Sequence, residues 1–123
     1  MRTKDAVGRY GEQLATDHIV AAGMRILARN WRCSEGELDI VARDGEQLVF
    51  IEVKTRSTTT FGDPAEAMTA AKIGRIHRLA VRWLAQQRDS GDVHGWSKLR
   101  FDLIAIVRLA EGGPRIRHVR DAF

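Results

Sequence analysis

Residues 36–56 decide the fold, and their sequence is Gly36-Glu-Leu-Asp-Ile-Val-Ala-Arg-Asp-Gly-Glu-Gln-Leu-Val-Phe-Ile-Glu-Val-Lys-Thr-Arg56. Polar and apolar residues alternate over 37–43, which predicts a half-buried strand. Asp44-Gly45 is a strong signal for a two-residue hairpin turn, because both residues tolerate positive φ. The next stretch, 47–54, is almost entirely apolar until Glu52, which is typical of a strand buried on both faces. The segment therefore predicts an antiparallel hairpin deep in a sheet.

The predicted turn also sets a register. With Asp44-Gly45 at its centre, Asp39 faces Phe50, and Asp39 shares one face of the hairpin with Glu52 and Lys54. Asp39 and Glu52 are then diagonal neighbours about 7–8 Å apart at Cα. Two carboxylates from adjacent strands can hold one cation between them.

Hard divalent cations such as Mg²⁺ or Mn²⁺ prefer carboxylate and water oxygens. A metal in this position polarises a phosphoryl oxygen and makes a bound water more acidic. The ammonium group of Lys54 can orient that water or stabilise the negative charge of the transition state. Zinc is disfavoured, because one cysteine and four scattered histidines show no tetrahedral ligand spacing. The pattern predicts a metal-dependent site for phosphodiester hydrolysis.

Each acid also has an ordinary structural interpretation. A charge that alternates along a strand usually belongs to a solvated face, which would account for Asp39 alone. Glu52 interrupts an apolar strand, where a charge is expensive unless it is paired. A structural ion pair of Glu52 with Lys54 or Arg100 is therefore the alternative. Glu12, on a face of small and apolar residues, has a salt bridge to a neighbouring arginine as its alternative.

The flanking segments predict two helices and three further strands. The first helix is capped by Thr3 and ended by Gly23, and its buried face is Gly8, Glu12, Ala15, Ile19 and Ala22. The second helix is capped either by Asp63, before Pro64, or by Thr69. The further strands are Met24–Arg32, Leu99–Leu109 and Arg115–Val119. This order predicts a single α/β domain, 1–123, with a mixed central sheet of about five strands flanked by helices.

The second predicted helix carries a basic stripe that spans about 120° of its surface: Lys72, Arg75, Arg78 and Arg82. The chain has a net charge of +4 and a pI near 9.8. A basic protein suits a polyanionic partner, because each neutralised phosphate releases condensed counterions. The stripe is therefore either a solvated helix face or a contact to nucleic acid. No glycine-rich turn follows a strand and opens a helix, which excludes a dinucleotide site or a phosphate-binding loop of known type.

The single cysteine, Cys33, cannot form an internal disulfide, which fits a reducing compartment. No apolar run approaches the roughly 20 residues of a membrane span, and the first residues lack the apolar core of a signal peptide. We expect a cytoplasmic protein.

Seven ordered motifs cover essentially the whole chain: Gly8-x-x-Gly11-Glu12-x-x-Ala15, Asn30-Trp31-Arg32, Gly36–Val41, Leu48–Arg56, Phe61-Gly62-x-Pro64-x-Glu66-Ala67, Arg100-Phe101-Asp102 and Asp121-Ala122-Phe123. With them the sequence closely resembles the YraN-like family of small bacterial proteins. That family is similar to a branch of the PD-(D/E)XK nuclease superfamily and to archaeal Holliday-junction resolvases. The motif set is specific, because chance agreement at so many ordered positions is remote.

The resemblance implies a restriction-endonuclease-like core with the site on the second and third strands. The superfamily's aspartate, glutamate and lysine match Asp39, Glu52 and Lys54, and the resolvase-type glutamate of the first helix matches Glu12. One position departs from the common pattern, because Leu38 stands before Asp39 where many members have proline. The expected activity is that of a Mg²⁺- or Mn²⁺-dependent endonuclease acting on DNA, including branched or recombination intermediates.

These inferences give each residue a role. Asp39 and Glu52 are expected to bind the metal, with the Val53 carbonyl as a further ligand. Glu12 is expected to hold a metal-bound water or to act as a base, and Lys54 to steady the attacking water. The basic stripe would contact the phosphate backbone of DNA.

The oligomeric state and the alternative functions stay open. Resolvase relatives act as dimers, so a homodimer is compatible with the resemblance, although the sequence gives no direct sign of one. The alternative function is a non-catalytic nucleic-acid-binding or adaptor module on a nuclease scaffold, because a fold can host unrelated tasks. A third possible function is that of a purely structural partner protein.

Overall fold

The computed structural model describes residues 6–56, 68–90, 93–109 and 111–123. Its elements in chain order are α1 (Ala6–Ala21), β1 (Arg25–Cys33), β2 (Gly36–Asp44), β3 (Gln47–Arg56), α2 (Ala70–Ser90), β4 (Lys98–Val107) and β5 (Arg115–Val119). The five strands form one sheet in the order β1-β2-β3-β4-β5. Strands β3 and β4 are parallel and the other neighbours are antiparallel. The predicted α/β fold with a mixed five-stranded sheet is confirmed, and it is consistent with a restriction-endonuclease-like core.

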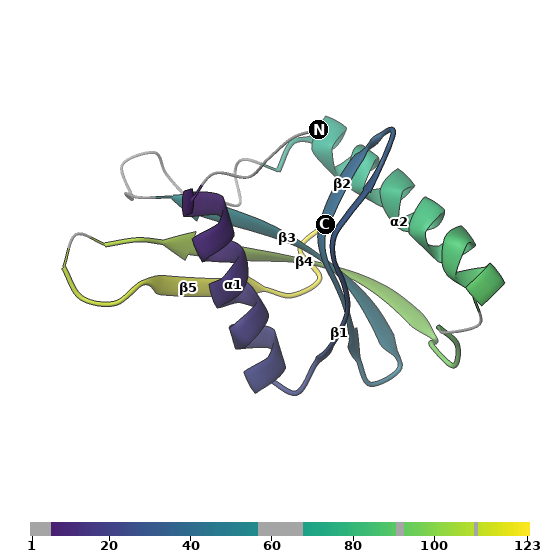
Figure 1. The fold of residues 1–123 in the computed structure, drawn as a ribbon, viewed down its shortest axis with the longest axis horizontal. Coiled ribbons are helices and arrows are strands. Elements are labelled where there is room, and N and C mark those ends of the chain that lie inside the picture. The colour runs from purple at the N-terminus through teal and green to yellow at the C-terminus, as the bar shows by residue number, and fades with distance from the viewer. Residues whose placement is uncertain (1–5, 57–67, 91–92, 110) are drawn as a thin grey trace.

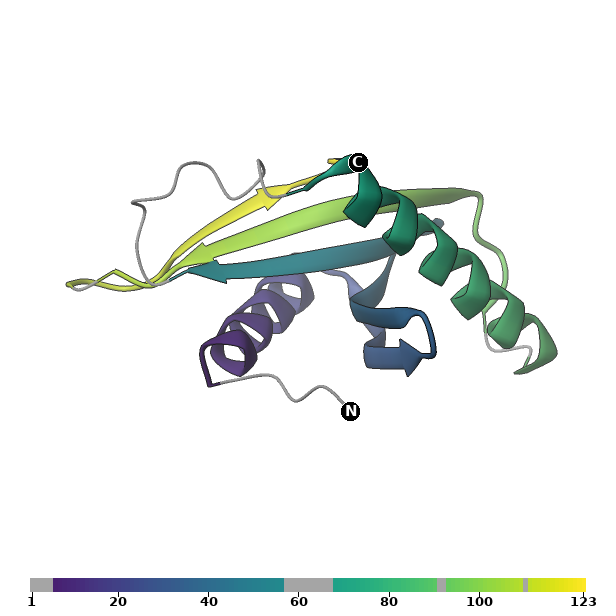
Figure 2. The same ribbon diagram turned by 90° about the horizontal axis from the view of Figure 1, so that it is seen from above.

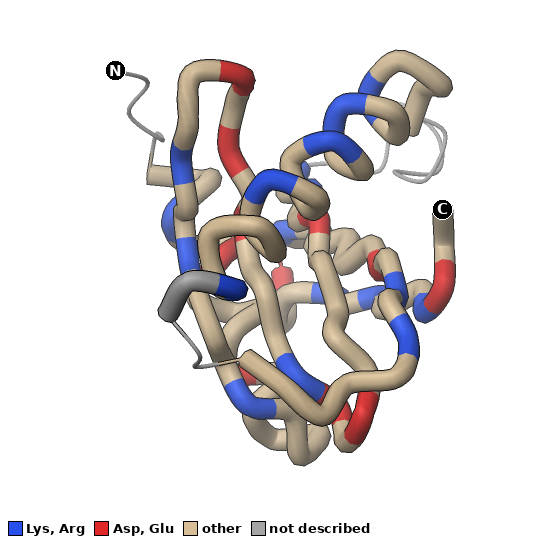
Figure 3. The backbone as a smooth tube through the Cα atoms, turned by 90° about the vertical axis from the view of Figure 1, so that its right-hand side faces the viewer, with Lys and Arg blue, Asp and Glu red and all other residues tan. Residues whose placement is uncertain are grey.

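The two helices lie against different parts of the sheet. Helix α1 crosses in front of β3, β4 and β5, and α2 runs beside the β1–β2 hairpin (Figure 1). Seen from above, α1 lies on one side of these three strands (Figure 2). Helix α2 is the crossover between the parallel strands β3 and β4, which a short turn cannot join. Lys and Arg recur along α2 (Figure 3).

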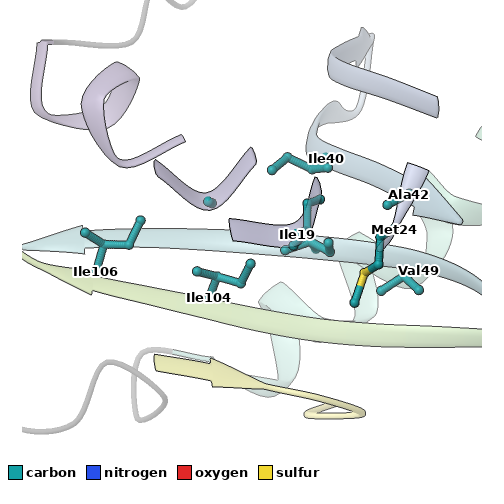
Figure 4. Packing of buried hydrophobic residues seen from close by; sticks show 9 residues of the cluster. Ile19, Met24, Ile40, Ala42, Val49, Ile104 and Ile106 are labelled. Atoms are coloured by element: carbon teal, nitrogen blue, oxygen red, sulfur yellow. The ribbon is translucent and has the colours of Figure 1, made fainter. Parts of the chain in front are cut away.

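Strand alternation divides the core into two clusters. Val49 and Ile51 face α1 and belong to one cluster with Ile19 of the helix. Figure 4 shows Val49 and Ile19 in this cluster. Leu48 and Phe50 face α2, where they pack with Trp83. Strand β3 is thus buried on both faces, as its nearly continuous apolar sequence predicts.

The register of the β2–β3 hairpin differs from the predicted one by two residues. The turn is centred on Gly45 and Glu46, with Asp44 opposite Gln47, so Val41 faces Phe50. Gly45 has a φ of 62° and Glu46 is not among the positive-φ residues, the pattern of a type II′ turn. A shift of two leaves the side chains of the paired residues, 40–44 and 47–51, on their predicted faces, whereas a shift of one would have reversed these faces.

The helix boundaries show which capping predictions hold. Gly23, with a φ of 92°, ends α1 as predicted, and its N–H donates to the Val20 carbonyl. Thr69 caps α2, because its Oγ1 accepts a hydrogen bond from the Lys72 N–H at 3.2 Å. The alternative cap at Asp63, and the predicted cap at Thr3, lie outside the described residues.

The buried face of α1 is rotated slightly from the predicted one. Gly11, Glu12, Ala15, Thr16 and Ile19 are buried, whereas Ala22 is exposed and Gly8 is half-buried. The helix ends at Ala21, so Ala22 already belongs to the turn. No helix among the described parts of the chain is long and apolar enough to cross a membrane.

Candidate metal centre

Strands β2 and β3 diverge at one point, which we call the fork: the last residues that they pair are Ile40 and Ile51. Beyond it, β2 continues beside β1 alone and β3 continues beside β4. Asp39 is the first residue of β2 past the fork. Its Oδ2 accepts a hydrogen bond from the Val53 N–H at 2.9 Å, where a ladder bond would otherwise form. A carboxylate thus sits in the opening between the strands.

A kink in β1 explains the divergence. Asn30 has a φ of 52°, a left-handed conformation that asparagine tolerates better than most residues. The β1–β2 ladder pairs Arg29 with Ile40 and Trp31 with Leu38, and it skips the intervening pair. Past the kink, Leu38 packs with the cluster on the α2 side, although alternation from Ile40 would place it toward α1. The end of the hairpin therefore turns toward α2.

Gly11 brings α1 against β3 beside the fork. A Cβ at this position would lie 1.7 Å from Thr55 Oγ1 and 2.8 Å from Thr55 Cβ. Only glycine allows the helix backbone this close to the strand. The next residue, Glu12, is 3% exposed. The close approach carries its carboxylate toward the fork.

Glu12, Glu37 and Asp39 form what we call the carboxylate cluster. One oxygen from each lies within 4.8 Å of the other two, and no other such group of acids, histidines or cysteines occurs among the described residues. Oε1 of Glu12 and Oε1 of Glu37 are shielded from solvent. Arg32 contacts the other side of Glu37, with its Nε 2.9 Å from Oε2. Three carboxylates from α1 and β2 therefore converge on one small volume.

The cluster fits a hard divalent cation. Oxygens bound to one Mg²⁺ at about 2.1 Å are at most about 4.2 Å apart, so the cluster needs to contract by less than about 1 Å. The donor set, all carboxylate oxygen, is the kind that Mg²⁺ and Mn²⁺ prefer. The N–H and C=O of one strand residue project to the same side, so the Val53 carbonyl also faces the fork. The role of this carbonyl as a further ligand stays a prediction.

Glu52 is not one of the three members of the carboxylate cluster, and its predicted role as a metal ligand stays a prediction. Its Oε1 is 3.4 Å from Lys54 Nζ, with 19% and 27% of the two side chains exposed. This is the Glu52–Lys54 pair that sequence reasoning kept as the alternative interpretation. The Lys54 ammonium also lowers the pKa of Lys72, through electrostatic repulsion more than through burial. Glu52 acts on the pKa of Lys72 in the opposite direction and raises it.

The four cations of the basic stripe of α2 differ in their exposure and in their contacts. Arg75 and Arg78 are exposed and Lys72 is half-buried. Arg82 donates to Glu35 Oε1 at 2.7 Å, and so ties the helix to the turn between β1 and β2. Trp31 Nε1 donates to Gln86 Oε1 at 2.8 Å and makes a second tie.

A second buried polar network lies away from the fork, around Asp102, which is fully buried. Arg100 donates to both of its oxygens, at 2.9 and 3.0 Å, and His118 Nε2 lies 2.7 Å from Oδ2. Burial alone would raise the pKa of Asp102, but the hydrogen bonds from His118 and Arg100 outweigh it and hold this pKa below the usual value. His18 Nε2 contacts His118 Nδ1 at 3.2 Å, and burial first, then His118, lowers the pKa of His18.

This network explains two of the sequence motifs without invoking catalysis. The Asp121 N–H donates to Asp102 Oδ1 at 3.0 Å, and the Ala122 N–H donates to the Phe101 carbonyl at 2.7 Å. The ring of Phe123 packs against those of Phe101 and His77. The residues 121–123 are thereby bound to β4.

Sequence reasoning assigned Glu37 no role. The missed signal was Asn30, a residue that tolerates positive φ inside a strand. A kink there breaks simple alternation, and Leu38 consequently packs on the α2 side. The involvement of Arg32 follows from the same kink, because Arg32 is paired with Glu37 across the hairpin.

Comparison with known proteins identifies relatives over the full length. The chain is 53% identical over 123 residues to a UPF0102 protein of Frankia casuarinae, with 100% of both chains covered. It is 51% identical over 120 residues to one of Beutenbergia cavernae, with 98% of both covered. It is also 51% identical over 118 residues to one of Rhodococcus jostii, with 96% of both covered. Residues 11–106 match the family described as "Uncharacterised protein family UPF0102". The resemblance to the YraN-like family is thus confirmed, and the chain belongs to the UPF0102 family.

Proposed function

We propose that this protein is a metal-dependent nuclease of the PD-(D/E)XK superfamily that hydrolyses phosphodiester bonds in DNA, branched intermediates included. The observation that carries the proposal is the carboxylate cluster at the fork, built by Glu12, Glu37 and Asp39 within 4.8 Å of one another. Charges this close repel strongly in a poorly solvated site, and a divalent cation offsets the repulsion.

Each residue contributes a distinct step. A bound Mg²⁺ or Mn²⁺ supplies Lewis acidity toward the phosphoryl oxygen and toward water. Asp39 is oriented for this ion by the Val53 N–H, and Glu37 is oriented by Arg32. Glu12, the most buried of the three acids, accepts the proton of the attacking water. The ammonium group of Lys54 neutralises charge that develops on the phosphate.

Substrate binding falls to three cations of α2, of which Arg75 and Arg78 are exposed and Lys72 is half-buried. Lys72, Arg75 and Arg78 are the members of the basic stripe that lie nearest the start of the helix, whereas Arg82 is held by Glu35. Such contacts position a phosphate backbone without reading base sequence. We accordingly propose a cytoplasmic enzyme that selects DNA by shape.

Cleavage of linear, flapped and four-way junction DNA tests the proposal. We expect product with Mn²⁺ or Mg²⁺ and none with EDTA. Asp39→Asn and Glu12→Gln should each reduce the rate by at least about 100-fold, which corresponds to about 2.7 kcal/mol of transition-state stabilisation. Asp17→Asn is the matched control, because Asp17 is an exposed carboxylate on the same helix as Glu12. Absence of metal-dependent cleavage on every substrate contradicts the proposal, and equal cleavage by Asp39→Asn reveals a contaminant.

A non-catalytic nucleic-acid-binding module is the second candidate, and the exposed cations of α2 favour it because they do not depend on a metal. In that case binding persists in EDTA and no product forms. Contacts from Lys72, Arg75 and Arg78 predict a slope of about −2.7 for the logarithm of affinity against the logarithm of salt concentration. Metal-dependent formation of cleavage product thus distinguishes the two candidate functions.

A further inference from the structure

We infer that α2 holds the end of the β1–β2 hairpin away from β3 and thereby sets the affinity of the fork for a metal ion. Two contacts, which we call the clamp, carry this effect: Arg82 with Glu35, and Gln86 with Trp31. Arg82 and Gln86 are then positioning residues, which act on the ion through the hairpin. The inference rests on the proposed function and deepens it, because one face of α2 controls metal affinity instead of binding DNA.

One face of α2 lies along the end of the hairpin. Its residues recur at intervals of four, three and four positions, which places them in one row on the helix surface: Arg75, Leu79, Arg82 and Gln86. The row meets the hairpin at Gly36, where a Cβ would lie 3.4 Å from Leu79 Cδ1 and 3.8 Å from Arg75 Cδ. The start of β2 therefore rests directly on side chains of the helix.

The clamp adds two polar contacts farther along this row. Arg82 Nη1 donates to Glu35 Oε1 at 2.7 Å, and Trp31 Nε1 donates to Gln86 Oε1 at 2.8 Å. Trp31 also packs against the apolar cluster on the α2 side of the sheet. Glu35 lies in the turn and Trp31 lies in β1, so the helix holds the hairpin end at two separate places.

The segment held by the clamp leads into the carboxylate cluster. Glu37 and Asp39 follow Glu35 by two and four residues. Arg32 Nε lies 2.9 Å from Glu37 Oε2 across the hairpin, which ties β1 to β2 at this point. A hairpin end that is not held toward α2 can extend the β2–β3 ladder past the fork, where the Val53 N–H now donates to Asp39. The clamp therefore favours the open fork in which the three carboxylates converge.

The sign of the effect distinguishes this role from simple electrostatics. Replacing Arg82 by a neutral residue removes a positive charge from the protein, and by charge alone it should tighten the binding of Mn²⁺. Loss of the clamp has the opposite effect, because the ion must then order the hairpin end itself. Weaker Mn²⁺ binding by Arg82→Gln is thus expected only if the contact with Glu35 positions the metal centre.

The first test is calorimetry with Mn²⁺ in the absence of DNA. We expect Arg82→Gln to weaken Mn²⁺ binding by about three- to fivefold, because an exposed ion pair of this kind contributes little more. Arg82→Lys keeps the cation and should restore most of the affinity. Arg78→Gln is the matched control, since it removes an exposed cation of the same helix that lies outside the row. It should leave the affinity unchanged or slightly tighter. Unchanged or tighter binding by Arg82→Gln overturns the clamp.

The second test breaks the other contact without changing any charge. Gln86→Met removes the acceptor of the Trp31 N–H and keeps a side chain of similar length. It should weaken Mn²⁺ binding by about threefold, the effect of one lost hydrogen bond. The affinity for a DNA duplex in EDTA should stay at the wild-type value. Unchanged Mn²⁺ affinity in Gln86→Met contradicts the inference.

The third test asks whether Arg82 contacts DNA instead. A fluorescently labelled duplex is titrated in EDTA and followed by anisotropy, so that no cleavage enters the readout. We expect Arg78→Gln to weaken duplex binding more than Arg82→Gln does, because Glu35 already engages Arg82. Equal losses of duplex binding in the two variants, with Mn²⁺ affinity unchanged in Arg82→Gln, assign Arg82 to DNA and overturn its positioning role.

These outcomes are distinguishable from a failure of the proposed function. Weaker Mn²⁺ binding by Arg82→Gln and Gln86→Met, without cleavage of any DNA, keeps the clamp and removes the nuclease. Metal-dependent cleavage with wild-type Mn²⁺ affinity in both variants does the reverse. A wild-type protein that binds no Mn²⁺ overturns both. Unfolding midpoints close to that of the wild type confirm that each variant is folded.

Discussion

Replacing Gly11 by alanine tests whether the contact between α1 and β3 places the carboxylate cluster. The new Cβ would lie 1.7 Å from Thr55 Oγ1 and 2.8 Å from Thr55 Cβ. Rotation of the Thr55 side chain can move Oγ1, but it cannot move Cβ. The backbones must then separate by roughly 0.6 Å to reach an ordinary contact of about 3.4 Å, and overpacking of this kind typically costs about 1–3 kcal/mol.

Gly74→Ala provides the matched control. A Cβ at Gly74, inside α2, would meet only the end of the Arg78 side chain, at 3.4 Å. Alanine is favoured over glycine by about 1 kcal/mol in a helix interior, so this variant should be stabilised by up to that amount. The same gain applies at Gly11, and the difference between the two variants therefore isolates the overpacking cost of about 1–3 kcal/mol.

Urea unfolding gives both free energies, and calorimetry gives Mn²⁺ affinity for the folded proteins. Gly11→Ala should weaken Mn²⁺ binding because it displaces Glu12, and Gly74→Ala should leave it unchanged. A Gly11→Ala/Thr55→Gly double variant removes the clashing atoms and should recover most of the lost affinity. Equal free energies of unfolding for the two alanine variants would refute the claim that this contact sets the position of α1.

Three further predictions concern stability. The pKa of His18 is lowered, so its contribution to the free energy of unfolding is present above about pH 6.5 and is lost as the pH falls through the folded-state pKa. The free energy of unfolding should therefore decline from pH 7 to 5, and it should decline less steeply in His18→Gln. Asp102 also has a lowered pKa, but as an acid it stabilises above its unfolded pKa of about 3.8 and loses this contribution as the pH falls further. Asp102→Asn should lower the free energy of unfolding at pH 7 by about 3–5 kcal/mol, because it leaves the guanidinium of Arg100 buried beside a neutral group. Urea unfolding measures this loss, and an unchanged free energy of unfolding at pH 7 would contradict the role of this network. Thr69→Ala should lower the free energy of unfolding by about 1 kcal/mol, because it removes the cap of α2, whereas Thr69→Ser should change it little. A lower melting temperature for Thr69→Ala than for Thr69→Ser would show the difference.

Most strands of this chain can be recognised from local sequence, because alternating or continuously apolar runs bounded by turn residues mark them. The predicted Arg115–Val119 strand agrees with β5, and Gln47–Lys54 differs from β3 only at its end. The two-residue error in the β2–β3 register came from placing Asp44-Gly45 at the turn centre. Gly45 is at the first central position, and Glu46 occupies the second without positive φ.

The candidate site was harder to predict, because it depends on contacts between distant segments. The position of Glu12 requires the packing of Gly11 on Thr55, which no local pattern specifies. The partner of Arg82, Glu35, depends on the direction in which the hairpin turns after Asn30. Alternation alone identified Asp39 but not the kink that turns the end of the hairpin toward α2.

The hydrogen bond between the Val53 amide and Asp39 gives the molecule an internal spectroscopic reporter. Any ion that binds Asp39 Oδ2 must share this oxygen with the Val53 N–H or take it away. The proton resonance of that single amide, and its rate of exchange with deuterium, therefore register the state of the fork directly. Titration with diamagnetic Mg²⁺ can be followed at this position in a ¹⁵N-labelled sample, without substrate and without altering any residue.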